Sequence, residues 1–371
     1  MRILHIATRH RLGGAERNLT FSVDWEVEHG HEVHVAIGRD SMLDQVPPAA
    51  TIHVIRDLVR EVSPLRDLRA YRALRKLITA GDFDLVHTHQ SKAGVLGRLA
   101  ARGTGRNVVH TIHMASFGPA YHPVASAVFL RAERLCAGWT TRIVSVGREL
   151  ASMYQRAGIG RASQYTVIRS RIDLDEFFHA RLVTPDVKQR RKADLGFDPD
   201  VPLAVVVSSL EPRKRVDHVV RELADLVRDE RLQLAIAGDG AMREQLASIA
   251  SKAGISTRAR LLGYVYDIPN LMSAADLLVH AATVEGVPQV VIQAWSAGLP
   301  VVATQMPGLR EIDGPPLLIA GSRPGDLAAA VLRQLAAPRT ILPPEAFAPW
   351  SRNGVEAALA RLHDDLETVS A

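Results

Sequence analysis

Cysteine is almost absent from this sequence of 371 residues, which contains only Cys136. One thiol cannot form a disulfide within the chain, so we expect the protein to work in a reducing compartment. No stretch reaches the roughly 18 uninterrupted apolar residues of a membrane-spanning helix. The N-terminal run MRILHIAT is too short for the apolar core of a signal peptide, and we expect it to form a strand. Together these absences predict a cytoplasmic protein.

A strong excess of one charge is also lacking, because the formal net charge is +5 and the isoelectric point is near 9.5. An excess of this size fits a phosphate-bearing ligand, an anionic membrane surface or nucleic acid. We do not expect nucleic acid as a partner, since no basic motif with interleaved aromatic residues is present. The apolar fraction of 47% is sufficient for large cores, and the length suggests two domains or one large domain.

What the sequence does contain is a regular alternation of short β-rich runs with longer helical patterns. Segments of helix length include 16–29, 64–80, 216–229 and 240–253. The alternation predicts parallel sheets with helices on both faces. The expected strands are 2–7, 32–37, 51–55, 85–88, 108–112, 142–146, 165–168, 203–208, 232–237, 260–262, 276–280, 301–304 and 317–319.

The alternation occurs twice, on either side of a polar, proline-containing segment at 178–202. We therefore predict an α/β fold with two Rossmann-like, doubly wound domains, 1–178 and 179–343, that face a central cleft. The last residues, 344–371, have a helical period and are expected to form a helix that packs back toward the first domain. In such sheets ligands bind beyond the carboxyl ends of the strands, so the residues that follow strands are the candidates for function.

The first candidate is the segment RHRLGGAERNL at 9–19, which follows the first expected strand. Gly13 and Gly14 open a helix there, and two glycines let backbone amides approach an anion near the positive end of the helix. The segment is not the dinucleotide fingerprint, because G-x-G-x-x-G is absent. An ordinary glycine turn explains the pair equally well.

Histidines gather at the ends of two expected strands, as His87 and His89 and as His110 and His113. We do not expect a metal site among them, since no carboxylate or cysteine accompanies them, and histidines at strand ends are commonly hydrogen-bonded. His113 is a candidate because its strand ends where the cleft is expected. His89 and Lys92 are candidates for contact with an acceptor or a phosphate, and a solvated lysine is the alternative for Lys92.

A run of three cations, Arg213, Lys214 and Arg215, follows the expected strand at 203–208. Cations on a loop at the carboxyl end of a strand suit a diphosphate. The alternative is a charged run that only contacts solvent.

The last candidate is the segment TVEGVPQVVIQAWSAGLPVVAT at 283–304, where Glu285 precedes an apolar helix. Pro288 suits the first turn of that helix, and a carboxylate is favoured at a helix N-terminus. Gln293 would lie about two turns on, roughly 80° round the helix from Glu285. Two acids at this spacing could hold two sets of sugar hydroxyls. An N-terminal charge and a buried amide without a ligand are the alternative.

Over essentially its whole length the chain resembles a retaining glycosyltransferase of family four, also called glycosyl transferases group one, which has the two-Rossmann GT-B fold. The most specific match is EGVPQVVIQAWSAGLPVVAT at 285–304. The other matching segments are LGGAERNL, VHTHQSKAGVLGRLAAR, VVHTIH, IRSRIDLDEF, LAIAGDGAMREQL and LLGYVYDIPNLMSAADLLV.

The resemblance makes Glu285 and His113 the candidate catalytic residues, with Glu285 on the donor-sugar hydroxyls and His113 near the sugar. It places Lys214 on the diphosphate, residue 293 on the ribose, and Gly263 with Tyr264 at the base. The candidate donor-binding residues are Gly13, Gly14, Ser209, Arg213, Lys214, Gly263, Tyr264, Gly286, Val287, Pro288, Gln289, Val290 and Gln293.

The chain departs from the family pattern at four places. The second acid of the family's E-x7-E motif is Gln293, and the arginine five residues before the diphosphate lysine is Ser209. The glycine after that lysine is Arg215, and the Asn-Gly of the interdomain motif is residues 170–171, Ser-Arg. Gln293 loses the charge-assisted part of a hydrogen bond, on the order of 1–2 kcal/mol. Arg213 or Arg215 can supply the charge missing at Ser209.

The resemblance implies transfer of a sugar from a UDP- or GDP-sugar to a glycan or lipid-linked acceptor, with retention, in cell-surface polysaccharide, lipopolysaccharide or glycolipid assembly. No cofactor and no metal ion are expected. Gln293 and Ser209 motivate one alternative, a GT-B protein that binds a partner but has lost turnover. A nucleotide-sugar epimerase of the same fold is the other alternative.

The segment 64–80 is a predicted amphipathic helix with five cations and one acid, Asp67. We expect its leucines to face the core of the first domain. Arg66, Arg69 and Arg72 can act from outside the core, where each cation near anionic lipid contributes up to about 1 kcal/mol. This predicts peripheral contact with the inner face of the cytoplasmic membrane.

Overall fold

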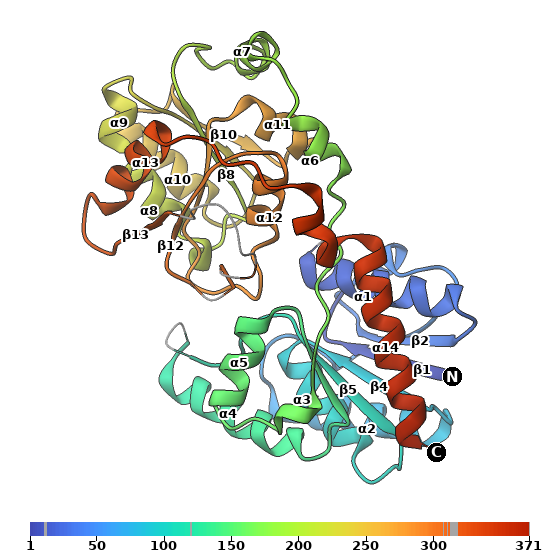
Figure 1. Cartoon of the computed structure of the whole chain (residues 1–371). Coiled ribbons are helices and arrows are strands. Elements are labelled where there is room, and N and C mark those ends of the chain that lie inside the picture. The colour runs from blue at the N-terminus through green and yellow to red at the C-terminus, as the bar shows by residue number, and fades with distance from the viewer. Residues whose placement is uncertain (11–12, 119–120, 307, 310, 312–317, 371) are drawn as a thin grey trace. The chain divides into compact units, whose positions relative to one another are not determined.

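The computed structural model describes residues 1–10, 13–118, 121–306, 308–309, 311 and 318–370 (Figure 1). The chain forms two compact units. Unit 1 is Met1–Arg171 with Pro349–Ala371, and unit 2 is Ile172–Ala348. The residues 172–178, which we assigned to the first domain, therefore lie in unit 2.

Unit 1 contains a seven-stranded parallel sheet in the order β3-β2-β1-β4-β5-β6-β7. Its strands are β1 (Arg2–Ala7), β2 (Glu32–Gly38), β3 (Thr51–Ile55), β4 (Leu85–His89), β5 (Asn107–Ile112), β6 (Arg142–Ser145) and β7 (Tyr165–Val167). Its α-helices are α1 (Gly14–Glu28), α2 (Pro64–Ala80), α3 (Ser91–Ala101), α4 (Pro123–Ala137), α5 (Arg148–Arg156) and α14 (Arg352–Ser370).

Successive strand residues in unit 1 point to opposite faces of the sheet, and each face has its own helices. Ile3 of β1 packs in a buried cluster with Trp25 of α1 and Leu359 of α14. Leu4 packs in a separate cluster with Leu74 of α2. The C-terminal helix α14 thus lies beside α1 and completes one core of unit 1 (Figure 1).

Unit 2 contains a six-stranded parallel sheet in the order β10-β9-β8-β11-β12-β13. Its strands are β8 (Leu203–Val207), β9 (Gln233–Ala237), β10 (Ala259–Gly263), β11 (Leu277–His280), β12 (Val301–Thr304) and β13 (Leu318–Ala320). Its α-helices are α6 (Asp175–Ala180), α7 (Pro185–Asp194), α8 (Val216–Glu222), α9 (Ala224–Arg228), α10 (Arg243–Lys252), α11 (Ile268–Ala274), α12 (Gln289–Ser296) and α13 (Asp326–Ala336).

Both sheets therefore have the doubly wound order that begins in the middle and proceeds outward in both directions, which confirms the predicted fold class. The predicted strands agree with the observed ones to within one or two residues, although residue 317 lies outside the described residues. The segment at 178–202 is no simple break, because it contains α7. Thr184 caps this helix by accepting a hydrogen bond from the Val187 amide.

Two predicted helices are divided. The helix expected at 216–229 is α8 and α9, with Leu223 between them. The segment expected to be one helix from residue 344 begins as the 3-10 segment Pro344–Trp350, and α14 follows. Pro349 explains this, since proline lacks the amide hydrogen that an α-helix needs. Within the described part of the chain, no helix has both the length and the apolar character needed to cross a bilayer.

Candidate functional site

The loops that follow β8 and β11 meet because these two strands are neighbours in the sheet of unit 2. The chain turns to opposite sides of the sheet after β8 and after β11, so the point between them is a topological switch point, where open α/β sheets bind ligands. The Thr283 amide donates to the Arg213 carbonyl over 2.9 Å, and the Thr283 hydroxyl donates to the same oxygen over 3.2 Å. The cation loop is thereby fixed to the loop that carries Glu285.

The Lys214 ammonium forms an ion pair with the Glu285 carboxylate, and each side chain is only 14% exposed. Arg213 Nη1 lies 3.6 Å from Glu285 Oε1, while Arg213 Nε donates to Glu211 over 2.8 Å. The structure therefore brings together the candidate diphosphate cations and the candidate sugar-binding carboxylate. Glu285 thus neutralises the lysine that an anion would need.

The loop geometry shows why a glycine is favoured at the position of Arg215. Arg215 has φ of 50°, in the left-handed region that favours glycine. The family glycine at this position is therefore replaced by a residue in a conformation that costs roughly 1–2 kcal/mol. The turn places Pro212–Lys214 as a short 3-10 segment directly before α8.

Glu285 precedes α12, as we predicted, but it lies further from the start of the helix than the predicted angle to Gln293 assumed. The helix α12 begins at Gln289, and Pro288 before it has an extended backbone. Because the ψ angle of Pro288 is 97°, the helical backbone cannot extend to the residues before it, and Glu285 belongs to the preceding loop. The predicted angle of roughly 80° between Glu285 and Gln293 is wrong for the same reason, because the two residues do not share one helix.

The remaining residues of this segment form the start of α12. Gly286 and Val287 belong to the loop, and the amides of Gln289 and Val290 are in the first turn, where an α-helix offers no internal acceptor. Such amides are free to bind an anion. Gln293 is half-buried one turn further on, and its backbone carbonyl accepts from the Ala297 amide over 3.0 Å.

Two polar residues that sequence reasoning missed lie at the same edge. His280 ends β11, and Ser208 directly follows β8. His280 Nε2 and Ser208 Oγ are buried and have no hydrogen-bond partner among the residues that the structure describes. Burial lowers the pKa of His280 to about 4, so its ring is neutral at pH 7. The sequence feature that could have identified them is their position: each is a polar residue at the carboxyl end of an apolar strand next to the switch point.

The residues expected at the base are at the end of β10, which β9 separates from β8: Gly263 is its last residue, and Tyr264 follows it. Tyr264 is 54% exposed and packs edge-on against Tyr266, with ring centroids 4.8 Å apart. Gly263 has φ of 74°, which suits its turn. Ser209 is exposed at the end of β8. Ser209 thus lies after the strand next to β11, whereas Gly263 and Tyr264 lie two strands further along the sheet.

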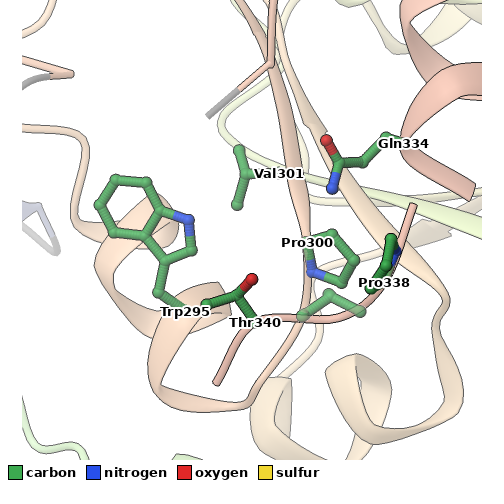
Figure 2. A pocket seen from close by; sticks show the side chains of 7 residues that line it. Trp295, Pro300, Val301, Gln334, Pro338 and Thr340 are labelled. Atoms are coloured by element: carbon green, nitrogen blue, oxygen red, sulfur yellow. The ribbon is translucent and has the colours of Figure 1, made fainter. Parts of the chain in front are cut away.

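A cavity elsewhere in unit 2 is too small for a ligand. Figure 2 shows it beside the β12 strand, with Trp295, Gln334 and Thr340 among the lining residues. Its volume is about 10 Å³, which corresponds to about one water molecule. We therefore restrict the candidate site of unit 2 to the switch point.

The corresponding switch point of unit 1 lies between β1 and β4. Gln90, after β4, accepts from the Thr8 amide over 3.0 Å and donates to the Arg9 carbonyl over 3.1 Å. It holds the start of the glycine loop, whose residues 11–12 lie outside the described residues. Gly13 precedes α1 and Gly14 is its first residue.

The candidate residues Lys92 and His89 are both engaged inside unit 1. Lys92 Nζ lies 2.5 Å from Asp67 Oδ1, and it also donates to the Glu61 carbonyl. A phosphate would have to displace these partners. His89 is buried, and hydrogen-bond distances join it to His5 (2.9 Å) and to His113 (3.3 Å).

His113 follows β5 and is half-buried. Burial lowers the pKa of its ring to about 4, so the ring is neutral at pH 7. Its Nδ1 atom is buried and has no hydrogen-bond partner in the described parts of the chain. A neutral ring with one unused nitrogen can accept or donate a proton.

Three buried histidines, His5, His87 and His89, place one nitrogen each within 4.8 Å of one another. This spacing could accommodate a metal ion. However, His5 uses both nitrogens, towards Glu26 (2.6 Å) and His89 (2.9 Å), and His87 Nε2 lies 2.7 Å from the Thr111 hydroxyl. The nitrogens are thus committed to hydrogen bonds.

Comparisons with known proteins identify the family of this chain. Residues 12–176 match Glycosyltransferase Family 4, and residues 187–339 match Glycosyl transferases group 1. EpsD of Bacillus subtilis (strain 168), named as a glycosyltransferase, is 30% identical over 298 residues, which are 78% of this chain and 75% of EpsD. A UDP-Gal:α-D-GlcNAc-diphosphoundecaprenol α-1,3-galactosyltransferase of Escherichia coli is 26% identical over 83% of this chain and 80% of its own.

Solved structures share the fold. Anabaena HepE in complex with UDP and glucose has a TM-score of 0.77 at 21% identity and covers 98% of this chain and 99% of its own. Sucrose-phosphate synthase of Thermosynechococcus elongatus has a TM-score of 0.82 at 18% identity and covers both chains fully, at 100% each. The resemblance seen in the sequence is confirmed: the chain belongs to glycosyltransferase family 4 and is a nucleotide-sugar-dependent glycosyltransferase with the GT-B fold.

Proposed function

We propose that this glycosyltransferase transfers a sugar from a UDP- or GDP-sugar to a glycan or lipid-linked acceptor, with retention, in cell-surface polysaccharide or glycolipid assembly. The observation that supports this most is the Lys214–Glu285 ion pair at the switch point of unit 2. The Escherichia coli relative also supports it, since its name gives UDP-Gal as donor and a diphosphoundecaprenol-linked sugar as acceptor.

In this proposal the donor diphosphate binds Lys214 and Arg213 and displaces Glu285 from the lysine. The released carboxylate then accepts hydrogen bonds from the sugar hydroxyls. The amides of the first turn of α12 and the neutral His280 ring supply further donors at the same edge. Fixed donors and cations stabilise the charge that develops on the departing nucleoside diphosphate, and they need no reorganisation to do so.

The proposed stereochemistry is retention by attack on the same face from which the diphosphate departs. A double displacement needs a carboxylate nucleophile. Gln293 is an amide and cannot serve as that nucleophile, and Glu285 is assigned to the hydroxyls. We therefore assign the departing phosphate as the base for the acceptor hydroxyl, with His113 acting near the sugar.

The test is incubation of the purified chain with a panel of UDP-, GDP- and ADP-sugars, with and without glycan and lipid-linked acceptors. We expect acceptor-dependent release of one nucleoside diphosphate and a product whose anomeric configuration matches the donor. Glu285→Ala should reduce transfer at least about tenfold, or ~1.4 kcal/mol. Asp225→Ala is the control, because Asp225 forms an exposed ion pair with Arg228 elsewhere in unit 2.

Inversion of configuration, or unchanged transfer by a folded Glu285→Ala variant, would contradict the proposal. Nucleotide-sugar turnover into an epimer without acceptor would instead support the epimerase. Binding of nucleotide with no turnover on any acceptor would support the inactive binding protein.

A second part of the proposal is peripheral contact with an anionic membrane through α2. Contrary to our expectation, Leu65 and Leu68 do not face the core, since they are 73% and 44% exposed. The buried residues of α2 are Ala70, Leu74 and Ile78, four positions apart, and Leu65 lies about 180° round the helix from Leu74. Apolar and cationic side chains therefore share the exposed side of α2.

The same end of α2 borders a cavity of about 310 Å³. Four cations and one carboxylate line it, namely Arg39, Arg56, Asp57, Arg66 and Arg69. This charge excess suits phosphate groups of lipids or of a lipid-linked acceptor. Flotation with liposomes tests the contact. The protein should float with anionic vesicles at low salt, dissociate at high salt and ignore neutral vesicles.

Replacement of Arg66, Arg69 and Arg72 by glutamine should abolish flotation while the fold persists. Replacement of Arg190, which lies exposed on α7 of unit 2, provides the control. Failure to float with anionic vesicles at low salt would contradict the membrane contact and favour an acceptor in solution.

A further inference from the structure

A continuous chain of hydrogen bonds crosses the covered face of the unit 1 sheet from His113 to Glu26. His113 Nε2 lies 3.3 Å from His89 Nδ1, His89 Nε2 lies 2.9 Å from His5 Nδ1, and His5 Nε2 lies 2.6 Å from Glu26 Oε2. The strand register produces this path. His5 of β1 is level with His87 of β4, and His89 is two residues beyond His87. His89 is level with Thr111 of β5, and His113 is two residues beyond Thr111.

The chain of bonds ends on a carboxylate in the interior. The Glu26 and His5 side chains are fully buried beneath α1 and α14, and His363 Nε2 of α14 lies 3.3 Å from the second Glu26 oxygen. Burial alone would raise the pKa of Glu26, but His5 and His363 outweigh it and lower that pKa. Glu26 is therefore ionised over the physiological range of pH.

An ionised carboxylate can only accept hydrogen bonds, so His5 donates to Glu26 from Nε2. Where the His5 ring carries no second proton, it accepts at Nδ1, and this sets the direction of the rest of the path. His89 then donates from Nε2 and accepts at Nδ1, and His113 donates from Nε2. The one nitrogen left without a proton is His113 Nδ1, the buried atom that has no partner within the described residues.

We propose that Glu26, His5 and His89 are positioning residues that fix His113 with an unprotonated Nδ1 and relay a proton taken up there to His5. This rests on the proposed role of His113 near the sugar. When His113 Nδ1 gains a proton, Nε2 of His113 gives its proton to His89 Nδ1. Nε2 of His89 then gives its proton to His5 Nδ1. The sum is one proton gained, and the positive charge rests on His5 beside the Glu26 carboxylate.

The relay removes the main obstacle to proton uptake by a buried histidine. A positive charge confined to His113 would lack a counterion, and burial opposes it. The same charge on His5 lies beside a carboxylate 2.6 Å away. His113 can then take up a proton from a group near the sugar and return it when the relay reverses. The other titratable or charged groups near the path include His87 on β4, His110 on β5, His363 on α14, Arg98 on α3 and His31, whose ring stacks on His363.

The chain offers a matched control at its surface. Glu32 Oε1 lies 2.8 Å from His34 Nε2, and His34 Nδ1 lies 2.9 Å from His53 Nε2. This is the same carboxylate–histidine–histidine sequence of contacts, on β2 and β3, but Glu32 is 59% exposed. It does not reach His113, so its disruption should leave the relay unchanged.

The first test uses the unmodified protein with ¹⁵N-labelled histidine, without donor or acceptor. Proton–nitrogen NMR correlations report which ring nitrogen carries the proton. Near pH 7 we expect His113 and His89 as Nε2–H tautomers and Glu26 ionised. A proton on His113 Nδ1 at that pH would overturn the proposal, and this measurement requires no variant to fold.

The second test is Glu26→Gln, which retains the shape of the side chain and removes its charge. Without the counterion, the midpoint of proton uptake by the relay histidines should fall by about one pH unit or more. The acidic limb of the transfer-rate profile should move by the same amount. Glu32→Gln should change neither. An unchanged midpoint in folded Glu26→Gln would overturn the relay.

The outcomes separate the relay from the proposed function. A correct His113 tautomer with unchanged transfer by His113→Ala would remove the role of His113 near the sugar and leave the hydrogen-bonded path. Loss of transfer by His113→Ala with a proton on Nδ1 in the unmodified protein would retain that role and overturn the relay.

Discussion

Substitution of Lys214 and substitution of Glu285 should change the affinity for nucleotide in opposite directions. The two side chains form an ion pair, and both are 14% exposed. A nucleoside diphosphate must compete with Glu285 for the lysine, and the carboxylate also repels the diphosphate. Glu285→Gln should therefore bind nucleoside diphosphate more tightly, whereas Lys214→Ala should bind it more weakly.

The size of the effect follows from the environment of the pair. Two unit charges 4 Å apart at an effective dielectric constant near 20 attract by about 4 kcal/mol. Desolvation of two largely buried ions cancels much of this, and a net coupling of about 1–2 kcal/mol remains. Removing the competitor should therefore tighten binding roughly 5- to 30-fold, and removing the lysine should weaken it at least about tenfold.

The assay is isothermal titration with UDP and with GDP at one ionic strength, accompanied by urea unfolding of each variant. Lys92→Ala is a matched control, because Lys92 forms an ion pair with Asp67 at similar exposure, 11% and 19%. All three single variants should lose stability through a broken ion pair. Only those at Lys214 and Glu285 should alter nucleotide affinity.

Weaker binding by folded Glu285→Gln would refute the competition argument. Equal loss of affinity in Lys92→Ala and Lys214→Ala would mean that the donor site had been assigned to the wrong unit.

Three further outcomes are expected. The free energy of unfolding should fall as the pH drops from about 6.5 towards 4, because the pKa values of His113 and His280 are lowered to about 4 each in the folded chain. The unfolded chain therefore binds protons first, which costs up to about 3 kcal/mol per histidine. Urea unfolding at several pH values measures this slope, and a flat profile would contradict the burial of these rings. Gln293→Glu should bind nucleoside diphosphate at least as well as the native chain in a titration, since a carboxylate can accept from both ribose hydroxyls; markedly weaker binding would show that the amide has another purpose. Turnover should persist in excess chelator, and its loss with rescue by one divalent ion would contradict a metal-free mechanism.

The sequence predicted the sheets well because their signal is local. Apolar runs alternate with helical periods, and polar residues mark the ends of strands, so the loops at the carboxyl edges could be identified without tertiary information. The resemblance implied that Lys214 and Glu285 bind parts of one donor, and the two side chains form an ion pair. The predicted angle between Glu285 and Gln293 was wrong because the extended backbone of Pro288 separates Glu285 from α12.

Other features could not be predicted because they depend on register and on distant parts of the chain. The orientation of Leu65 depends on which residues of α2 are buried. The buried residues are Ala70, Leu74 and Ile78, and Leu65 on the opposite side of the helix is exposed. The path from His113 to Glu26 requires His5 to be level with His87 on another strand. It also requires α14, from the other end of the chain, to cover the same face.

The geometry favours Arg213 over Arg215 as the cation that compensates for the family arginine missing at Ser209. Arg215 has left-handed backbone geometry and forms the turn into α8, so its position is dictated by the chain path. Arg213 lies 3.6 Å from Glu285, the same carboxylate that binds Lys214. Two cations thus share one acid at the site where a diphosphate is proposed to bind. When the acid is displaced, both cations become available to one anion, and we infer that Arg213 supplies the missing charge.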